Sequence, residues 1–332
     1  IKAIPQDFEV EEIPAYTPCG DGEHLFLWIE KTGLPAAALT KHVARSLELS
    51  PRDVGCAGLK DTHAVTRQFI SVPAKSLPHL PRLETPQVRL LSHGLHRNKL
   101  KTGHLRGNRF TVVIRDPGPD AAARAAAIVA HLEAFGVPNF YGQQRFGRDG
   151  QTLGMGLRAL HGEAVPELDR PGAGSLRRLA LSSVQSALFN EVLSARLADG
   201  LLHTVLPGDV LQVCASGGPF VTDDVAREQT RFDAREVVLA GPMFGPKMRQ
   251  ATGVARARED AVLTGHGLSL DDFARHGKLL LGTRRPLIMW PEGLTCAATA
   301  DGLRLQFTLP AGAYATTVLR ELIRDDAPPR PA

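Results

Sequence analysis

The chain has 332 residues, of which 43% are hydrophobic and 22% charged, a composition typical of a globular protein long enough for two domains. No apolar run reaches the roughly 20 residues of a membrane span, and no signal peptide opens the sequence. The four cysteines lie far apart without a CxxC pair, which argues against disulfides and structural zinc. We therefore expect a cytoplasmic protein.

The first 135 residues indicate short strands with two helices. Alternating apolar positions predict strands at the start of this region, and two later runs have helical spacing. The expected strands are 8–13, 25–29, 53–57, 68–72 and 110–114, and the expected helices are 34–47 and 120–135. Gly136 and Pro138 end the second helix, which makes this point a plausible domain junction.

The middle of the chain has a different character. An amphipathic helix is expected at 182–198, followed by short strands and short helices. The remaining expected elements are strands at 209–213 and 237–239, helices at 259–264 and 270–276, and then a strand at 303–309 and a helix at 314–323. Because the strand pattern of the first region returns after Pro286, the sequence predicts an insertion into one domain.

Asp61 lies on the loop between the expected strands 53–57 and 68–72, where catalytic side chains are commonly displayed. Lys60, His63 and Arg67 lie nearby in sequence and are expected to favour its ionised form. The alternative is a solvated turn residue beside a surface lysine, and the loop alone does not decide between the two.

A basic segment at residues 86–115 carries no acid and has a net charge of +7, which leaves the rest of the protein at −3. Its cations are Arg89, Arg97, Lys99, Lys101, Arg106, Arg109 and Arg115. Such a cluster on a near-neutral protein indicates a localised site for a polyanion. The alternative is a solvated cationic hairpin.

Two further stretches combine amides with aromatic rings. Asn108 and Phe110 stand at the end of the basic segment, and residues 139–147 interleave Phe, Tyr, Asn, Gln and Arg145. Proteins use this mixture to stack on unpaired bases and to bond their edges. Each stretch could also serve packing alone. The residues thus indicate an enzyme or binder acting on RNA, with a lone carboxylate as the candidate for chemistry.

Several motifs, in order from the second residue to near the C-terminus, resemble those of the TruD family of tRNA pseudouridine synthases. They lie at residues 2–12, 20–25, 57–68, 105–110, 137–147 and 309–322. The resemblance implies an α+β fold, with a pseudouridine synthase catalytic domain built on a bent mixed β-sheet flanked by helices. A family-specific α/β domain would be inserted into it, giving a V-shaped molecule with a cleft for tRNA. By this resemblance the catalytic domain comprises 1–135 and 289–332, and the inserted TRUD domain comprises 136–288.

The resemblance also implies that uridine 13 of tRNA becomes pseudouridine, with Asp61 as either the nucleophile at ribose C1′ or the base at C2′. The uridine would be flipped out of the folded RNA first. Residues expected to bind the substrate are Lys2, Phe8, Lys60, Asn108, Phe110 and Tyr314. Residues expected to bind RNA are His63, Arg67, Arg97, Lys99, Lys101, Arg106, Arg109 and Arg145.

Because the reaction is an isomerisation, we expect no metal and no small-molecule cofactor. The expected partner is tRNA, with no membrane, and the protein is expected to work as a monomer. Two alternatives are a catalytically silent RNA-binding protein on the same scaffold and a metal-dependent RNA hydrolase. The presence of both Asp61 and Lys2 disfavours the first, and the lack of clustered ligands disfavours the second.

Overall fold

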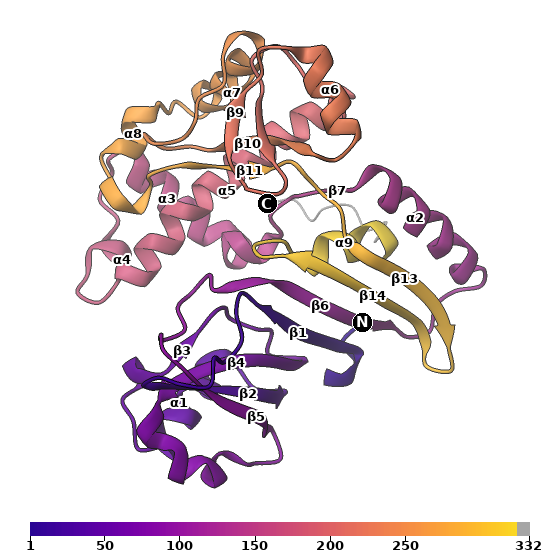
Figure 1. Cartoon of the computed structure of the whole chain (residues 1–332). Coiled ribbons are helices and arrows are strands. Elements are labelled where there is room, and N and C mark those ends of the chain that lie inside the picture. The colour runs from indigo at the N-terminus through magenta and orange to yellow at the C-terminus, as the bar shows by residue number, and fades with distance from the viewer. Residues whose placement is uncertain (324–332) are drawn as a thin grey trace. The chain divides into compact units, whose positions relative to one another are not determined.

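The computed structural model describes residues 1–323, and these divide into two compact units (Figure 1). The first unit contains Ile1–Phe135 and Trp290–Ala315. The second contains Gly136–Met289 and the described residues from Thr316 onward. Each unit has its own sheet, so each is described by itself.

The first unit is built on an eight-stranded mixed sheet with the order β13-β14-β6-β1-β4-β2-β5, in which β3 also pairs with β4. Only β1 and β4 pair in parallel, and the other neighbours are antiparallel. The strands are β1 (Phe8–Pro14), β2 (His24–Thr32), β3 (Gly55–Cys56), β4 (Val65–Pro73), β5 (Val88–His96), β6 (Leu105–Ile114), β13 (Glu292–Thr299) and β14 (Gly302–Pro310).

Helix α1 (Ala36–Ser46) covers one face of β2 and β4. It presents Leu39 and Val43 to a core that includes Leu27 and Ile70. There are three 3-10 segments: η1 (Pro5–Asp7) precedes β1, η2 (Pro51–Asp53) lies between α1 and β3, and η3 (Ala74–Leu83) lies between β4 and β5. Helix α2 (Ala121–Phe135) packs near β13. The sequence prediction of an α+β fold with a mixed sheet flanked by helices is confirmed.

The second unit has a four-stranded antiparallel sheet with the order β11-β10-β8-β9 and a short β12-β7 pair. Helix α5 packs against β10 and against helices α3, α4 and α7. The strands are β7 (Val137–Pro138), β8 (Val210–Val213), β9 (Pro219–Val221), β10 (Val237–Met243), β11 (Thr283–Pro286) and β12 (Ile288–Met289). The helices are η4 (Gln143–Phe146), η5 (Arg148–Gly150), α3 (Gln151–Leu160), α4 (Pro166–Asp169), α5 (Gly174–Ala198), α6 (Val225–Asp233), α7 (Gly253–Gly265), α8 (Leu270–Ala274), η6 (Gly277–Leu279) and α9 (Ala315–Ile323).

Helix α5 begins eight residues before the predicted helix, because residues 174–181 continue the apolar pattern through Ala180 and Leu181. The strand predicted at 303–309 is β14, and it places Phe307 directly opposite Phe110 of β6. The C-terminal part of the chain thereby completes the sheet that the N-terminal part begins.

Candidate active site

Asp61 lies on the loop from β3 to β4, and its side chain is 47% exposed. The Lys2 ammonium lies 3.4 Å from its Oδ1 atom and 4.0 Å from the centre of the Phe8 ring. Lys2 has a φ of 60°, a left-handed conformation that is costly for a residue with a side chain. The local backbone thus holds a cation between an aromatic ring and an exposed carboxylate.

A second lysine contacts the main chain of the same residue. Lys31 of β2 is completely buried, and its ammonium donates to the main-chain carbonyl of Asp61. Burial lowers the pKa of Lys31 to about 8, and the charge of Asp61 opposes part of this fall. Lys31 was not among the predicted site residues, although the sequence contains a signal for it. Strand alternation places it on the same face as Leu27 and Ile29, so an amine on an apolar face required a partner.

A third lysine anchors the loop next to Asp61. The Lys60 ammonium lies 2.8 Å from Glu12 Oε2 and 2.8 Å from Asn108 Oδ1. The side chains of this ion pair are 4% and 1% exposed, and the second Glu12 oxygen accepts from the Phe69 amide at 3.4 Å. Glu12 was also missed, although it alternates with Phe8 and Val10 on a buried strand face.

The expectation that sequence neighbours supply the charges around Asp61 was wrong for two of the three. Lys60 pairs with Glu12, and Arg67 pairs with Glu30 and Glu9 at 2.9 and 3.3 Å. His63 is exposed. The cation that pairs with the Asp61 carboxylate is Lys2, 59 residues away in sequence, which is the residue that the resemblance places near this carboxylate.

Two of the aromatic residues assigned to the substrate by resemblance, Phe8 and Phe110, form a row with Phe307 on one sheet face. Phe8 contacts Phe110 edge-on, with ring centres 6.1 Å apart, and Phe110 stacks on Phe307 at 5.3 Å. Asn108 lies on the same face because it is opposite Glu12 in the β1–β6 register. Tyr314 is half-buried, just after the end of β14.

The basic segment is more heavily paired than its sequence suggests. Arg97 binds Asp21 at 2.9 Å and Arg109 binds Glu11 at 3.1 Å. Other members bind acids outside the segment as well, namely Arg89 with Glu30 and Arg115 with Asp7 and Asp301. Among residues 1–323, Lys99, Lys101 and Arg106 make no ion pair, so these three carry the cationic character that remains for a polyanion. Lys99 donates to the Arg52 carbonyl.

Arg67 and Arg109 lie on the sheet face opposite to that of Phe110, since strand neighbours alternate. There they form ion pairs with Glu9, Glu11 and Glu30. The structure therefore does not bring these two arginines together with the Phe8–Phe110 row.

Arg145 belongs to the second unit and is held by structural contacts. Its guanidinium donates to Ser186 at 3.1 Å and to Ser182 at 3.0 Å. The Asn190 side chain makes two hydrogen bonds to the same loop, both 2.9 Å long. Its Oδ1 atom accepts from the Tyr141 main-chain amide and its Nδ2 atom donates to the Tyr141 main-chain carbonyl. Packing thus explains much of the aromatic and amide content of this stretch.

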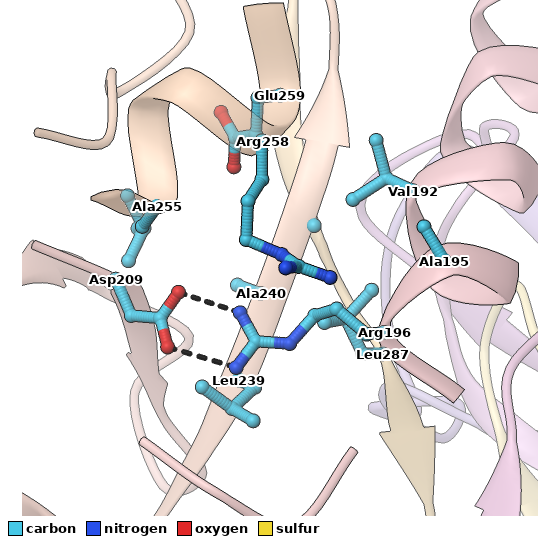
Figure 2. Close-up of a pocket in the computed structure, with 12 residues that line it drawn as sticks. Val192, Ala195, Arg196, Asp209, Leu239, Ala240, Ala255, Arg258, Glu259 and Leu287 are labelled. Carbon is cyan, nitrogen blue, oxygen red and sulfur yellow. Dashed lines mark hydrogen bonds and ion pairs between the residues drawn. The ribbon is translucent and has the colours of Figure 1, made fainter. Parts of the chain in front are cut away.

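The second unit also encloses a small charged cavity of about 20 Å³, shown in Figure 2, which is room for about one water molecule. Arg196 makes two bonds to Asp209, at 2.6 and 2.9 Å, and Arg284 binds Glu259 at 2.9 Å. Burial raises the pKa of Glu259, and Arg284 counteracts the rise. These pairs are buried and matched, which indicates a structural role.

Metal and membrane features are not found in residues 1–323. This part of the chain contains no group of three or more His, Cys, Asp or Glu residues arranged to hold a metal ion. Within the same residues, no helix is long and apolar enough to cross a membrane.

The family model for tRNA pseudouridine synthase D (TruD) matches residues 1–168 and 162–322. The chain belongs to the TruD family. It is a tRNA pseudouridine synthase, an isomerase. The order of motifs along the sequence and the family model therefore agree.

Relatives of the TruD family match over nearly the whole chain. tRNA pseudouridine synthase D of Anaeromyxobacter dehalogenans strain 2CP-1 is 44% identical, over 98% of this chain and 93% of its own length. The protein of the same name from Thermus thermophilus is 42% identical, over 98% of this chain and 89% of its own length. The crystal structure of the Methanosarcina mazei TruD protein shares the fold, with a TM-score of 0.75 and 22% identity over 98% of this chain and 93% of that one.

Proposed function

We propose that this TruD protein isomerises uridine 13, in the D-arm region of tRNA, and that Asp61 is its catalytic residue. The observation that carries the proposal is the position of Asp61. Its carboxylate is exposed beside Lys2, while the loop behind it is fixed by the buried Lys31 and Lys60. A carboxylate that must meet a flipped base needs both exposure and a rigid support.

Two routes fit this geometry. As a nucleophile, Asp61 attacks ribose C1′ and the C1′–N1 bond breaks, with its electron pair leaving on the uracil. As a base, Asp61 takes the C2′ proton and the same bond breaks, which leaves a C1′=C2′ double bond. In both routes the uracil anion turns and C5 bonds to C1′. In the first route this displaces the Asp61 carboxylate from C1′, and in the second Asp61 returns the proton to C2′. The C5 proton then departs to solvent and N1 takes up a proton. A slower reaction with 2′-deuterated uridine supports the second route.

The remaining assignments are parts of the same proposal. Ile1–Phe135 and the chain from 289 form the catalytic domain, and 136–288 form the inserted TRUD domain. Lys2, Phe8 and Phe110 would receive the flipped uridine, with Asn108, Lys60 and Tyr314 beside them. The protein would act on tRNA as a cytoplasmic monomer.

Release of tritium from C5-tritiated tRNA in the presence of EDTA tests this function. We expect release by the wild-type protein and none by Asp61→Asn, which keeps the size of the side chain but removes its charge. Asp53→Asn is the matched control, since Asp53 is an exposed acid eight residues earlier, and it should release tritium like the wild type. Release by Asp61→Asn, or loss of wild-type activity in EDTA, refutes the proposal.

A further inference from the structure

An open groove of about 700 Å³ lies between helix α1 and the turn that leads into β5. Leu34 and Ala38 supply its apolar surface, and Thr85, Pro86, Gln87 and the buried Val88 form one wall. The opposite wall is cationic, formed by Lys41, His42 and Arg45 of α1. No acid lines the groove, although acids and bases are nearly equal in number over the whole chain.

The two cations of this wall are available for a ligand. Lys41 and Arg45 are exposed, lie one helical turn apart on the same helix face, and make no ion pair within residues 1–323. Most arginines of the basic segment, in contrast, already bind acids. His42 is fixed by a hydrogen bond to the Leu83 carbonyl at 2.9 Å, so the wall has a defined shape.

Two hydrogen bonds link the groove to the chain that follows Asp61. The Gly33 amide donates to the Ala64 carbonyl at 3.2 Å, three residues after Asp61. The Gln87 side chain, which lines the groove, donates to the Gly33 carbonyl at 3.5 Å. Gly33 is thus bonded both to the chain just after Asp61 and to a residue that lines the groove.

We propose that the groove binds the RNA strand adjoining the nucleotide that Asp61 receives, an inference that rests on the proposed function. Lys41 and Arg45 would contact two phosphates, while Leu34 and Ala38 would pack against ribose or base. A cationic groove that follows the backbone is a usual means of holding single-stranded nucleic acid without sequence preference. The groove is therefore a positioning surface for the backbone and carries no chemistry itself.

Salt dependence of binding to an unmodified tRNA transcript tests the groove. Removal of one cation that binds a phosphate reduces the slope of log K against log salt by about 0.7 for a single strand and about 0.9 for a duplex. Lys41→Gln with Arg45→Gln should therefore flatten the slope by about 1.4 to 1.8, and weaken binding on the order of tenfold at about 0.1 M salt. Both positions are exposed, so the variant should fold.

The matched control is Lys75→Gln with Arg124→Gln, which removes the same charge. Lys75 and Arg124 are exposed, and neither lines the groove. Lys75 follows Ala74, which binds the Glu23 carbonyl next to the start of β2, whereas the groove lies beyond the end of that strand. The control should keep the wild-type slope.

If the groove variant binds tRNA with the wild-type affinity and salt slope, the inference is overturned. It is also overturned if the control variant loses as much affinity as the groove variant, because that result would indicate a nonspecific effect of net charge. Tritium release by the wild-type protein is measured in parallel. Its absence refutes the proposed function itself, whereas its presence with an unaltered groove variant refutes the groove alone.

Discussion

Lys31→Met tests whether the buried amine positions Asp61. Methionine has nearly the length of lysine and suits an apolar environment, but it cannot donate to the Asp61 carbonyl. Lys31 is completely buried and cannot contact the tRNA in this conformation. Any effect on the reaction must therefore pass through the Asp61 loop.

The expected change in stability is small because two terms oppose each other. The fall in the pKa of Lys31 from 10.5 to about 8 corresponds to about 3 kcal/mol against the buried ammonium. Methionine removes this cost but leaves the Asp61 carbonyl without its donor, which costs about 1–3 kcal/mol. We expect the free energy of unfolding to stay within about 2 kcal/mol of the wild-type value.

The expected change in activity is large. A displacement of about 1 Å at a catalytic group can cost about 100-fold in rate, so kcat should fall on the order of 100-fold while KM stays near its wild-type value. The assay is tritium release as a function of tRNA concentration, with urea melts of the same samples and Lys75→Met as control. If Lys31→Met has the wild-type kcat, Lys31 does not position Asp61. If its free energy of unfolding falls by much more than about 2 kcal/mol, the two opposing terms do not balance as expected.

The pH dependence of stability gives an independent check. The pKa of Lys31 is lower in the folded protein than in the unfolded chain, so the unfolded state binds more protons at this site between about pH 8 and 10.5. Wild-type stability should therefore rise with pH in that window relative to Lys31→Met, and the difference should be constant below about pH 7. Urea melts at pH 7 and pH 10 measure it. Parallel changes in both proteins would mean that Lys31 keeps its ordinary pKa.

Three further predictions concern other charged groups. Glu12→Gln leaves the Lys60 ammonium buried without a carboxylate and should lower the free energy of unfolding, measured in urea melts, by about 3–5 kcal/mol. The double variant Glu12→Leu with Lys60→Met should recover much of this stability. A loss of less than about 1 kcal/mol in Glu12→Gln would contradict the stabilising role of the ion pair. Lys99→Glu with Lys101→Glu should weaken tRNA binding and reduce the slope of log K against log salt. An unchanged slope would mean that these two lysines belong to a solvated face and do not contact RNA. Arg196→Met leaves the Asp209 carboxylate buried without its cation and should lower the free energy of unfolding, measured in thermal melts, by about 3–5 kcal/mol. A variant that melts like the wild type refutes this prediction.

Local patterns predicted much of the fold and the loop of Asp61. The alternation of strands 8–13 and 303–309 and the helical spacing of 34–47 appear in the structure as β1, β14 and α1. Asp61 was expected between two strands, and it lies between β3 and β4. These features depend on interactions between residues that are close in sequence, and such interactions leave a periodic signal.

The partners of the loop could not be predicted in the same way. Lys31 and Glu12 meet the loop only because β1, β2 and β4 are neighbours in the sheet, and strand order is not encoded by the period of any one strand. Alternation marks both as polar groups on buried faces. It predicts that each needs a partner, but not which one.

The pairing of β6 with β14 constrains how the enzyme is made. Thr111 and Gln306 are 195 residues apart in sequence, yet they are neighbours in the sheet. At about 5–20 residues per second, the ribosome needs on the order of ten seconds or more to supply β14 after β6 has emerged. During that interval β6 has an open edge, which is a hazard for aggregation. Phe307 reaches Phe110 only when synthesis of β14 is complete, so a nascent chain completes this aromatic row late in synthesis.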